Sequence, residues 1–164
     1  MRNYALIISL LFITGISELT AQDETSANFY INGGVGVSSM NLGMNAGVNL
    51  RVDNVVATIR AAGAATGVFG SAIEEFGFLL GYIEKAGDIH FTVSGGLGES
   101  KYDESKGLFT KSVISKSIGL AFEGRLCYSF WSFIGIGVAL YGNLNEAKSF
   151  IGINLNLFIG SLDL

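Results

Sequence analysis

The chain has 164 residues, of which 49% are hydrophobic and only 15% are charged, and its formal net charge is −4. This length allows one ordinary domain, and the mild acidity argues against a nucleic-acid partner. The only cysteine, Cys127, excludes an internal disulfide framework. After the N-terminus no apolar run approaches the roughly 18–20 residues of a membrane-spanning helix, so the hydrophobicity must follow another pattern.

The first 21 residues have the pattern of a signal peptide. Arg2 supplies the positive charge, Tyr4 to Ile16 form a short apolar core, and a plausible cleavage site precedes Gln22. We therefore expect a cleaved signal peptide over 1–21 and a mature domain over 22–164. An uncleaved membrane anchor is the alternative.

The mature chain begins with two stretches of alternating polarity. The first is expected to be a strand over 28–38, and a tight turn at Ser39 and Met40 leads into the second, over 41–53. In the second stretch every even position is apolar and every odd position is polar or glycine. Because successive side chains of a strand point to opposite faces, one face is apolar and the other is polar. The length exceeds the usual 5–6 residues of a strand and suits the roughly 9–11 of a tilted membrane-spanning strand.

The same alternation continues to the C-terminus and predicts eight strands in all. The remaining six are expected at about 55–65, 73–84, 88–98, 113–126, 131–142 and 149–161. The connecting turns are expected at 53–54, 84–87 and 127–130, and the longest polar loop at 99–112. An even number of strands lets the last strand pair with the first, and this closure is required in lipid because an open edge leaves backbone groups unpaired. An eight-stranded barrel has an interior that side chains just fill.

These features predict an all-β fold, an eight-stranded antiparallel up-and-down transmembrane β-barrel. On strand count, alternation and signal peptide, the whole mature chain resembles the small eight-stranded outer-membrane barrels of Gram-negative bacteria, the class that includes the outer-membrane protein A barrel. The resemblance implies a multi-pass protein of the cell outer membrane, in contact with its lipid. The sequence departs from the class at its end, Ser161 to Leu164, where such barrels usually carry an aromatic residue.

Several charged residues and the only histidine fall on the polar face, which the barrel would turn inward. We expect them to form a structural network in the lumen: Arg51, Arg60, Glu75, Asp88, His90, Glu123 and Arg125. A narrow ion path gated by the same pairs is the alternative, since buried charges must pair or be hydrated. A catalytic relay of His90 with Asp88 and Ser94 is not expected, because same-face neighbours on one strand are about 6–7 Å apart. No cofactor or metal is expected.

Aromatic residues indicate an orientation. Six of them gather at the rim that carries the short turns: Phe29, Tyr30, Tyr82, Tyr128, Phe130 and Trp131. Short periplasmic turns and longer outer loops are the usual asymmetry of such barrels, so the 99–112 segment is expected outside the cell. It supplies the candidate contacts with an extracellular ligand or protein: Lys101, Tyr102, Asp103, Glu104 and Lys106.

The expected role is non-enzymatic, as a structural or surface-interaction protein that acts through its outer loops. One alternative is an exported soluble barrel that binds a lipid or another apolar ligand. That alternative requires Leu50, Val93, Ile136 and Leu155 to line an internal pocket, while Asn49, Ser94 and Asn154 face water. A narrow channel and a lipid-modifying outer-membrane enzyme are the others.

Overall fold

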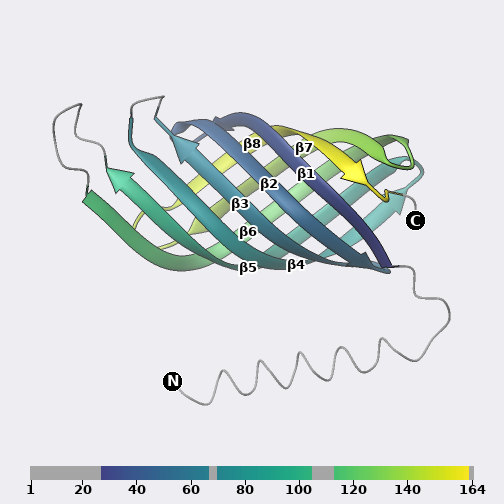
Figure 1. Ribbon diagram of the computed structural model, residues 1–164, viewed down its shortest axis with the longest axis horizontal. Coiled ribbons are helices and arrows are strands. Elements are labelled where there is room, and N and C mark those ends of the chain that lie inside the picture. The colour runs from purple at the N-terminus through teal and green to yellow at the C-terminus, as the bar shows by residue number, and fades with distance from the viewer. Residues whose placement is uncertain (1–26, 67–69, 105–112, 163–164) are drawn as a thin grey trace, which may run out of the picture.

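A computed structural model describes residues 27–66, 70–104 and 113–162 of the chain. They form one closed antiparallel barrel in which each strand pairs with the next and β1 pairs with β8 (Figure 1). The strands are β1 Ala27–Ser38, β2 Asn41–Val52, β3 Val55–Ala65, β4 Ala72–Ala86, β5 Ile89–Glu104, β6 Val113–Trp131, β7 Ile134–Leu144 and β8 Phe150–Gly160. Within the described ranges no helix has the length and apolar character needed to cross a membrane. The predicted signal peptide and Lys106 lie outside these ranges.

The apolar face of the strands points outward and the polar face points inward. Leu50, Val93, Ile136 and Leu155 are between 37% and 61% exposed, whereas Asn49, Ser94 and Asn154 are at most 4% exposed. The predicted facing is therefore confirmed at all of these positions. The soluble alternative, which places the apolar residues around an internal ligand, is wrong.

The outer face forms an apolar band of the height that a membrane requires. On β4 the outward-facing residues between Glu74 and Glu84 are all apolar or aromatic: Phe76, Phe78, Leu80 and Tyr82. Ten strand positions at about 3.3 Å each, tilted by roughly 40°, span about 25 Å, which is the height of the lipid-facing band of outer-membrane barrels. In water so large an apolar surface would drive association, so this face is a bilayer surface.

The two ends of the barrel differ. We call the end where β1 begins and β8 finishes the terminal end, and its turns have two residues each: Asp53–Asn54, Gly87–Asp88 and Ser132–Phe133. Exposed aromatics lie beside these turns, with Tyr128 edge-on to Phe130 at 5.1 Å and Trp131 stacked on Phe133 at 5.9 Å. At the opposite end, the loop end, β5 and β6 are the longest strands and extend beyond their neighbours (Figure 1).

Two predicted turns are misplaced. The turn expected at 127–130 belongs to β6, which continues to Trp131, because Cys127 and Ser129 still point inward while Tyr128 and Phe130 point outward. The turn expected at 84–87 lies instead at Gly87–Asp88, where Gly87 has a φ of 62° that favours glycine. The first six residues of the predicted loop 99–112 belong to β5.

Candidate functional site

The lumen has an apolar cluster at each end. The terminal-end cluster consists of Tyr30, Val56, Cys127, Phe158 and Leu162. The loop-end cluster consists of Met40, Ala62, Ala64, Ile73, Tyr141 and Phe150. Most of the buried polar side chains lie on the strand segments between these two clusters. Arg51 and His90 instead lie level with the terminal-end cluster, because they pair across strands with Val56 and Cys127.

The chain after β8 helps to close the terminal end. The backbone N–H of Ser161 donates to the carbonyl of Phe29 at 2.8 Å, and that of Leu162 donates to the carbonyl of Ser132 at 2.8 Å. These two bonds hold the Leu162 side chain against the terminal-end cluster, where it is buried. The hollow beside it encloses only about 10 Å³, room for at most one water molecule.

Arg60 and Glu75 form a fully buried ion pair inside the barrel. Arg60 Nη2 lies 2.5 Å from Glu75 Oε1, and Arg60 Nε donates to the same oxygen at 3.1 Å. The rest of the guanidinium donates to backbone carbonyls, with Nη1 2.7 Å from the oxygen of Phe122 and Nη2 3.0 Å from that of Gly142. One guanidinium therefore connects β3 to β4, β6 and β7 across the barrel.

Glu123 and Arg125 lie two residues apart on β6, and neutral amides hold both of them. Asn45 donates to Glu123 Oε1 at 3.1 Å and accepts a hydrogen bond from Asn154 at 2.9 Å. Arg125 Nη1 donates to Asn32 Oδ1 at 3.0 Å and to Asn49 Oδ1 at 2.7 Å. Amide groups from β1, β2 and β8 thus surround these two charges.

The asparagines also bond to one another. Asn49 Nδ2 donates to Asn32 Oδ1 at 2.9 Å, and Asn32 Nδ2 donates to Asn156 Oδ1 at 3.2 Å. The Thr58 hydroxyl donates to Asn49 Oδ1 at 2.8 Å. We call Arg125 with these four residues the amide cluster. The alternation predicts that the asparagines lie on the inner face, but it does not identify them as partners of the charges, because the register of the strands determines which side chains meet.

The predicted lumen residues divide into those that the barrel buries and one that it does not. Arg51, Arg60, Glu75, His90, Glu123 and Arg125 are buried side chains of the inner face. Asp88 lies in the two-residue turn before β5 and is exposed, so it is separate from the lumen residues. The physical reason is the turn at Gly87, which begins β5 one residue later than the alternation suggested.

His90 bonds to the neighbouring strand β6. Its Nε2 lies 2.9 Å from the hydroxyl oxygen of Ser129 on β6. The alternation along β5 relates His90 to same-face neighbours such as Asp88 and Ser94, so it does not predict this partner, which is 39 positions away. In the described part of the chain no group of three histidine, cysteine or acidic side chains is arranged to hold a metal ion.

The predicted contact residues lie at the loop end of β5. The Lys101 ammonium is 4.0 Å from Glu74 Oε2 on the outer face. The Tyr102 ring packs against the loop-end cluster, and Lys148 from the β7–β8 loop lies 5.9 Å from the centre of that ring. Asp103 and Glu104 are half-buried.

Several solved structures of outer-membrane proteins share this fold. The N-terminal barrel domain of OprF from Pseudomonas aeruginosa superimposes with a TM-score of 0.63 and 12% identity, covering 85% of this chain and 99% of that one. Neisserial surface protein A gives a TM-score of 0.60 and 9% identity, covering 84% and 99%. Ail of Yersinia pestis, solved with the heparin analogue sucrose octasulfate, gives 0.53 and 13%, covering 82% and 94%. No protein-family model and no curated protein sequence matches the chain.

Structural matches at such low sequence identity show the fold and leave the activity open. The chain is an eight-stranded transmembrane β-barrel of the small outer-membrane type, with an apolar outer face and a polar inner face.

Proposed function

We propose that the protein is a non-conducting, non-enzymatic barrel of the outer membrane, which acts as a structural or surface-interaction protein through its loop end. One observation carries this proposal: apolar clusters occupy both ends of the lumen, and protein groups hold the guanidinium groups of Arg60 and Arg125 between them. A lumen filled in this way leaves the lipid-facing surface and the two ends as the places where a partner can be met.

An ion path is disfavoured because the lumen charges are engaged in protein contacts. A conducting pore needs water along its whole length, since an ion that loses its hydration shell pays a large desolvation cost. Here the guanidinium of Arg60 contacts a carboxylate and two carbonyls, and that of Arg125 contacts two amides and a hydroxyl. The lumen charges therefore act as cross-links between strands.

Conductance across a planar lipid bilayer tests this part of the proposal. The reconstituted full-length mature barrel is expected to give no current steps, and Arg51→Ala is expected to stay silent while losing stability. A channel protein of known conductance in the same bilayer serves as the control. Steps in the wild type that grow with Arg51→Ala would establish the ion path instead.

The loop end is proposed as the cell-surface contact region, with Lys101, Tyr102, Asp103 and Glu104 at its centre. All three turns of the terminal end have two residues, and exposed aromatics lie beside them, whereas the loop end has one such turn, Ser39–Met40, and longer connections elsewhere. This is the asymmetry expected of a periplasmic rim. The long β5 and β6 strands project from the opposite end and carry these side chains with them.

Thiol labelling of intact cells tests this orientation. Lys148→Cys, in the exposed β7–β8 loop, is expected to react with a membrane-impermeant maleimide, while Asn54→Cys, in a terminal-end turn, is expected to react only after the outer membrane is broken. The native Cys127 is buried, so the parent protein gives the background. Labelling of Asn54→Cys but not of Lys148→Cys in intact cells would reverse the orientation.

A further inference from the structure

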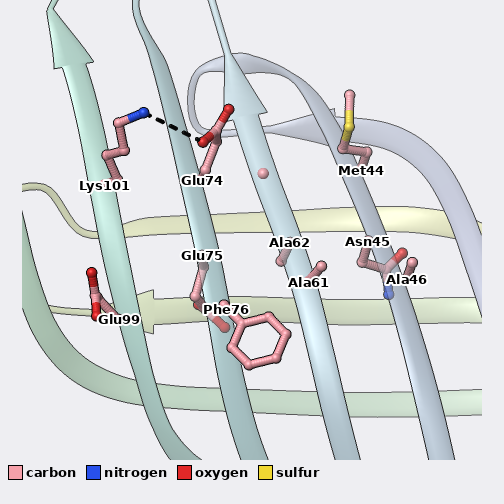
Figure 2. A pocket seen from close by; sticks show the side chains of 11 residues that line it. Met44, Asn45, Ala46, Ala61, Ala62, Glu74, Glu75, Phe76, Glu99 and Lys101 are labelled. Atoms are coloured by element: carbon pink, nitrogen blue, oxygen red, sulfur yellow. Dashed lines mark ion pairs between the residues drawn. The ribbon is translucent and has the colours of Figure 1, made fainter.

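The outer face carries a hollow of about 600 Å³ over strands β2 to β5. Small residues form its floor, with Ala46 opposite Ala61 on β3 and Gly63 between the longer side chains of β2 and β4. Met44 stands on one side and Phe76 on the other (Figure 2). The volume lies within the range of about 300–1,000 Å³ that is usual for small-molecule sites.

The hollow crosses from the hydrocarbon layer to the membrane surface. Gly63 pairs across strands with Glu74, and Ala61 pairs with Phe76. The hollow is therefore polar towards the loop end, beside Glu74, and apolar beside Phe76. Glu74 marks the loop-end limit of the 25 Å apolar band on β4, at about the depth of lipid headgroups. A hollow at this depth faces lipid once the barrel is inserted, so a lipid acyl chain is the group available to fill it.

Charged side chains border the polar end of the hollow. Lys101 faces Glu74 at 4.0 Å, the outer limit of an ion pair, and the two side chains remain 44% and 77% exposed. Lys116, the cross-strand partner of Lys101, lies closer to its own carboxylate, 3.3 Å from Glu99. A lysine ammonium has three donors and a carboxylate several acceptor sites, so Lys101 can still receive an anion and Glu74 can still accept a hydroxyl.

We propose that this hollow is a binding site for one membrane lipid whose head carries a phosphate and hydroxyl groups. One acyl chain lies over Ala61 and Gly63 beside the Phe76 ring, the phosphate meets the Lys101 ammonium, and a headgroup hydroxyl donates to the Glu74 carboxylate. The site is additional to the surface-interaction role. It requires only that the outer face lie in a bilayer, so its test does not depend on the orientation or on a silent lumen.

Quenching of a tryptophan by spin-labelled lipid tests the proposal. Phe76→Trp in a Trp131→Phe background places the only tryptophan beside the hollow, because the native chain has a single tryptophan. The full mature barrel is reconstituted in phosphatidylcholine vesicles that contain a small fraction of phosphatidylglycerol or phosphatidylcholine with a nitroxide on its acyl chain. Labelled phosphatidylglycerol is expected to bind at this position about threefold more strongly than labelled phosphatidylcholine. This ratio is the affinity gain expected from one solvent-exposed ion pair.

Matched variants separate a site from general lipid contact. Lys101→Gln and Ala61→Leu are each expected to bring the ratio of the two affinities to about one, because the first removes the ammonium and the second fills the floor. Lys148→Gln changes the net charge by the same amount as Lys101→Gln, and Ala57→Leu adds the same bulk as Ala61→Leu, but nearer the terminal end of β3. Both control variants are therefore expected to keep the preference for phosphatidylglycerol. Equal quenching by the two lipids in the parent, or a preference that survives both Lys101→Gln and Ala61→Leu, overturns the proposal. The different gel positions of boiled and unboiled samples verify folding of each variant.

Discussion

Two buried arginines in the same lumen have their charge compensated in different ways. Arg60 contacts a carboxylate directly, through two nitrogens that share Glu75 Oε1. Arg125 contacts the amide oxygens of Asn32 and Asn49. Each guanidinium also lies against an aromatic ring, 5.9 Å from the centre of Tyr141 for Arg60 and 5.7 Å from that of Tyr30 for Arg125. The rings are therefore common to both, and the difference lies in the acceptor groups.

The comparison separates two ways to bury a charge. An ion pair gains strong attraction but leaves a bare charge behind when either partner is lost, which costs about 3–5 kcal/mol. A set of neutral acceptors shares the charge among several hydrogen bonds, each worth about 1.5–3 kcal/mol to a charged group, and no single loss exposes a second ion. The loss of one member should therefore cost more at the Arg60–Glu75 pair than at the amide cluster around Arg125.

The largest effect is expected from Glu75→Ala. The substitution leaves the Arg60 guanidinium buried without a counter-ion, so the free energy of unfolding should fall by about 3–5 kcal/mol. Urea-induced unfolding in lipid vesicles, followed by the fluorescence of Trp131, measures this change. The single tryptophan of the chain makes the signal unambiguous.

A double variant is the control for the ion pair. Arg60→Met with Glu75→Leu replaces both charges by apolar groups and should cost less than Glu75→Ala alone, because no ion is left unpaired. A double variant at least as unstable as the single variant would show that the lost contacts to Phe122 and Gly142 matter more than the charge.

A smaller effect is expected from Arg125→Met. Its removal leaves neutral amide oxygens without one donor, and these still accept hydrogen bonds from Thr58 and from each other. We expect a loss of about 1.5–3 kcal/mol in the same unfolding measurement, below that of Glu75→Ala. Arg125→Lys keeps the charge but not the planar fork that contacts two amides, so it should recover only part of the loss. A loss larger than that of Glu75→Ala would contradict the comparison.

The facing of the strands could be predicted from sequence, whereas the ends of some strands could not. Alternation with a period of two fixes which side chains share a face, and the barrel follows it from Leu42 to Val52 without exception. At the loop end of β5 both faces carry polar side chains, with Glu99 and Lys101 outside and Ser100 inside. Such a segment has no apolar face to reveal a strand that extends beyond the membrane, so its sequence predicts a loop.

The inner-face charges could be predicted individually but not as pairs. Arg60 and Glu75 meet because β3 pairs with β4 along the whole of β3, which brings Arg60 opposite Gly77 and next to Glu75. Asn45 and Glu123 are 78 positions apart and meet across the lumen, a contact that depends on closure of the barrel. Distances of this kind follow from register and shear, which a pattern along one strand does not contain.

The smallest effect, and the finest test of the amide cluster, is expected from Thr58→Val. This nearly isosteric change removes the hydroxyl that donates to Asn49 at 2.8 Å and lies 3.5 Å from Arg125 Nη2, so the loss in unfolding free energy should be about 1 kcal/mol. If the cluster acts as a unit, the same substitution in an Arg125→Met background should cost a different amount, because residues of one hydrogen-bond network couple by about 0.5–3 kcal/mol. Equal costs in the two backgrounds would mean that Thr58 and Arg125 contribute independently. The charge of Arg125 would then rest on Asn32 and Asn49 alone, and the contrast with Arg60 would reduce to two amides against one carboxylate.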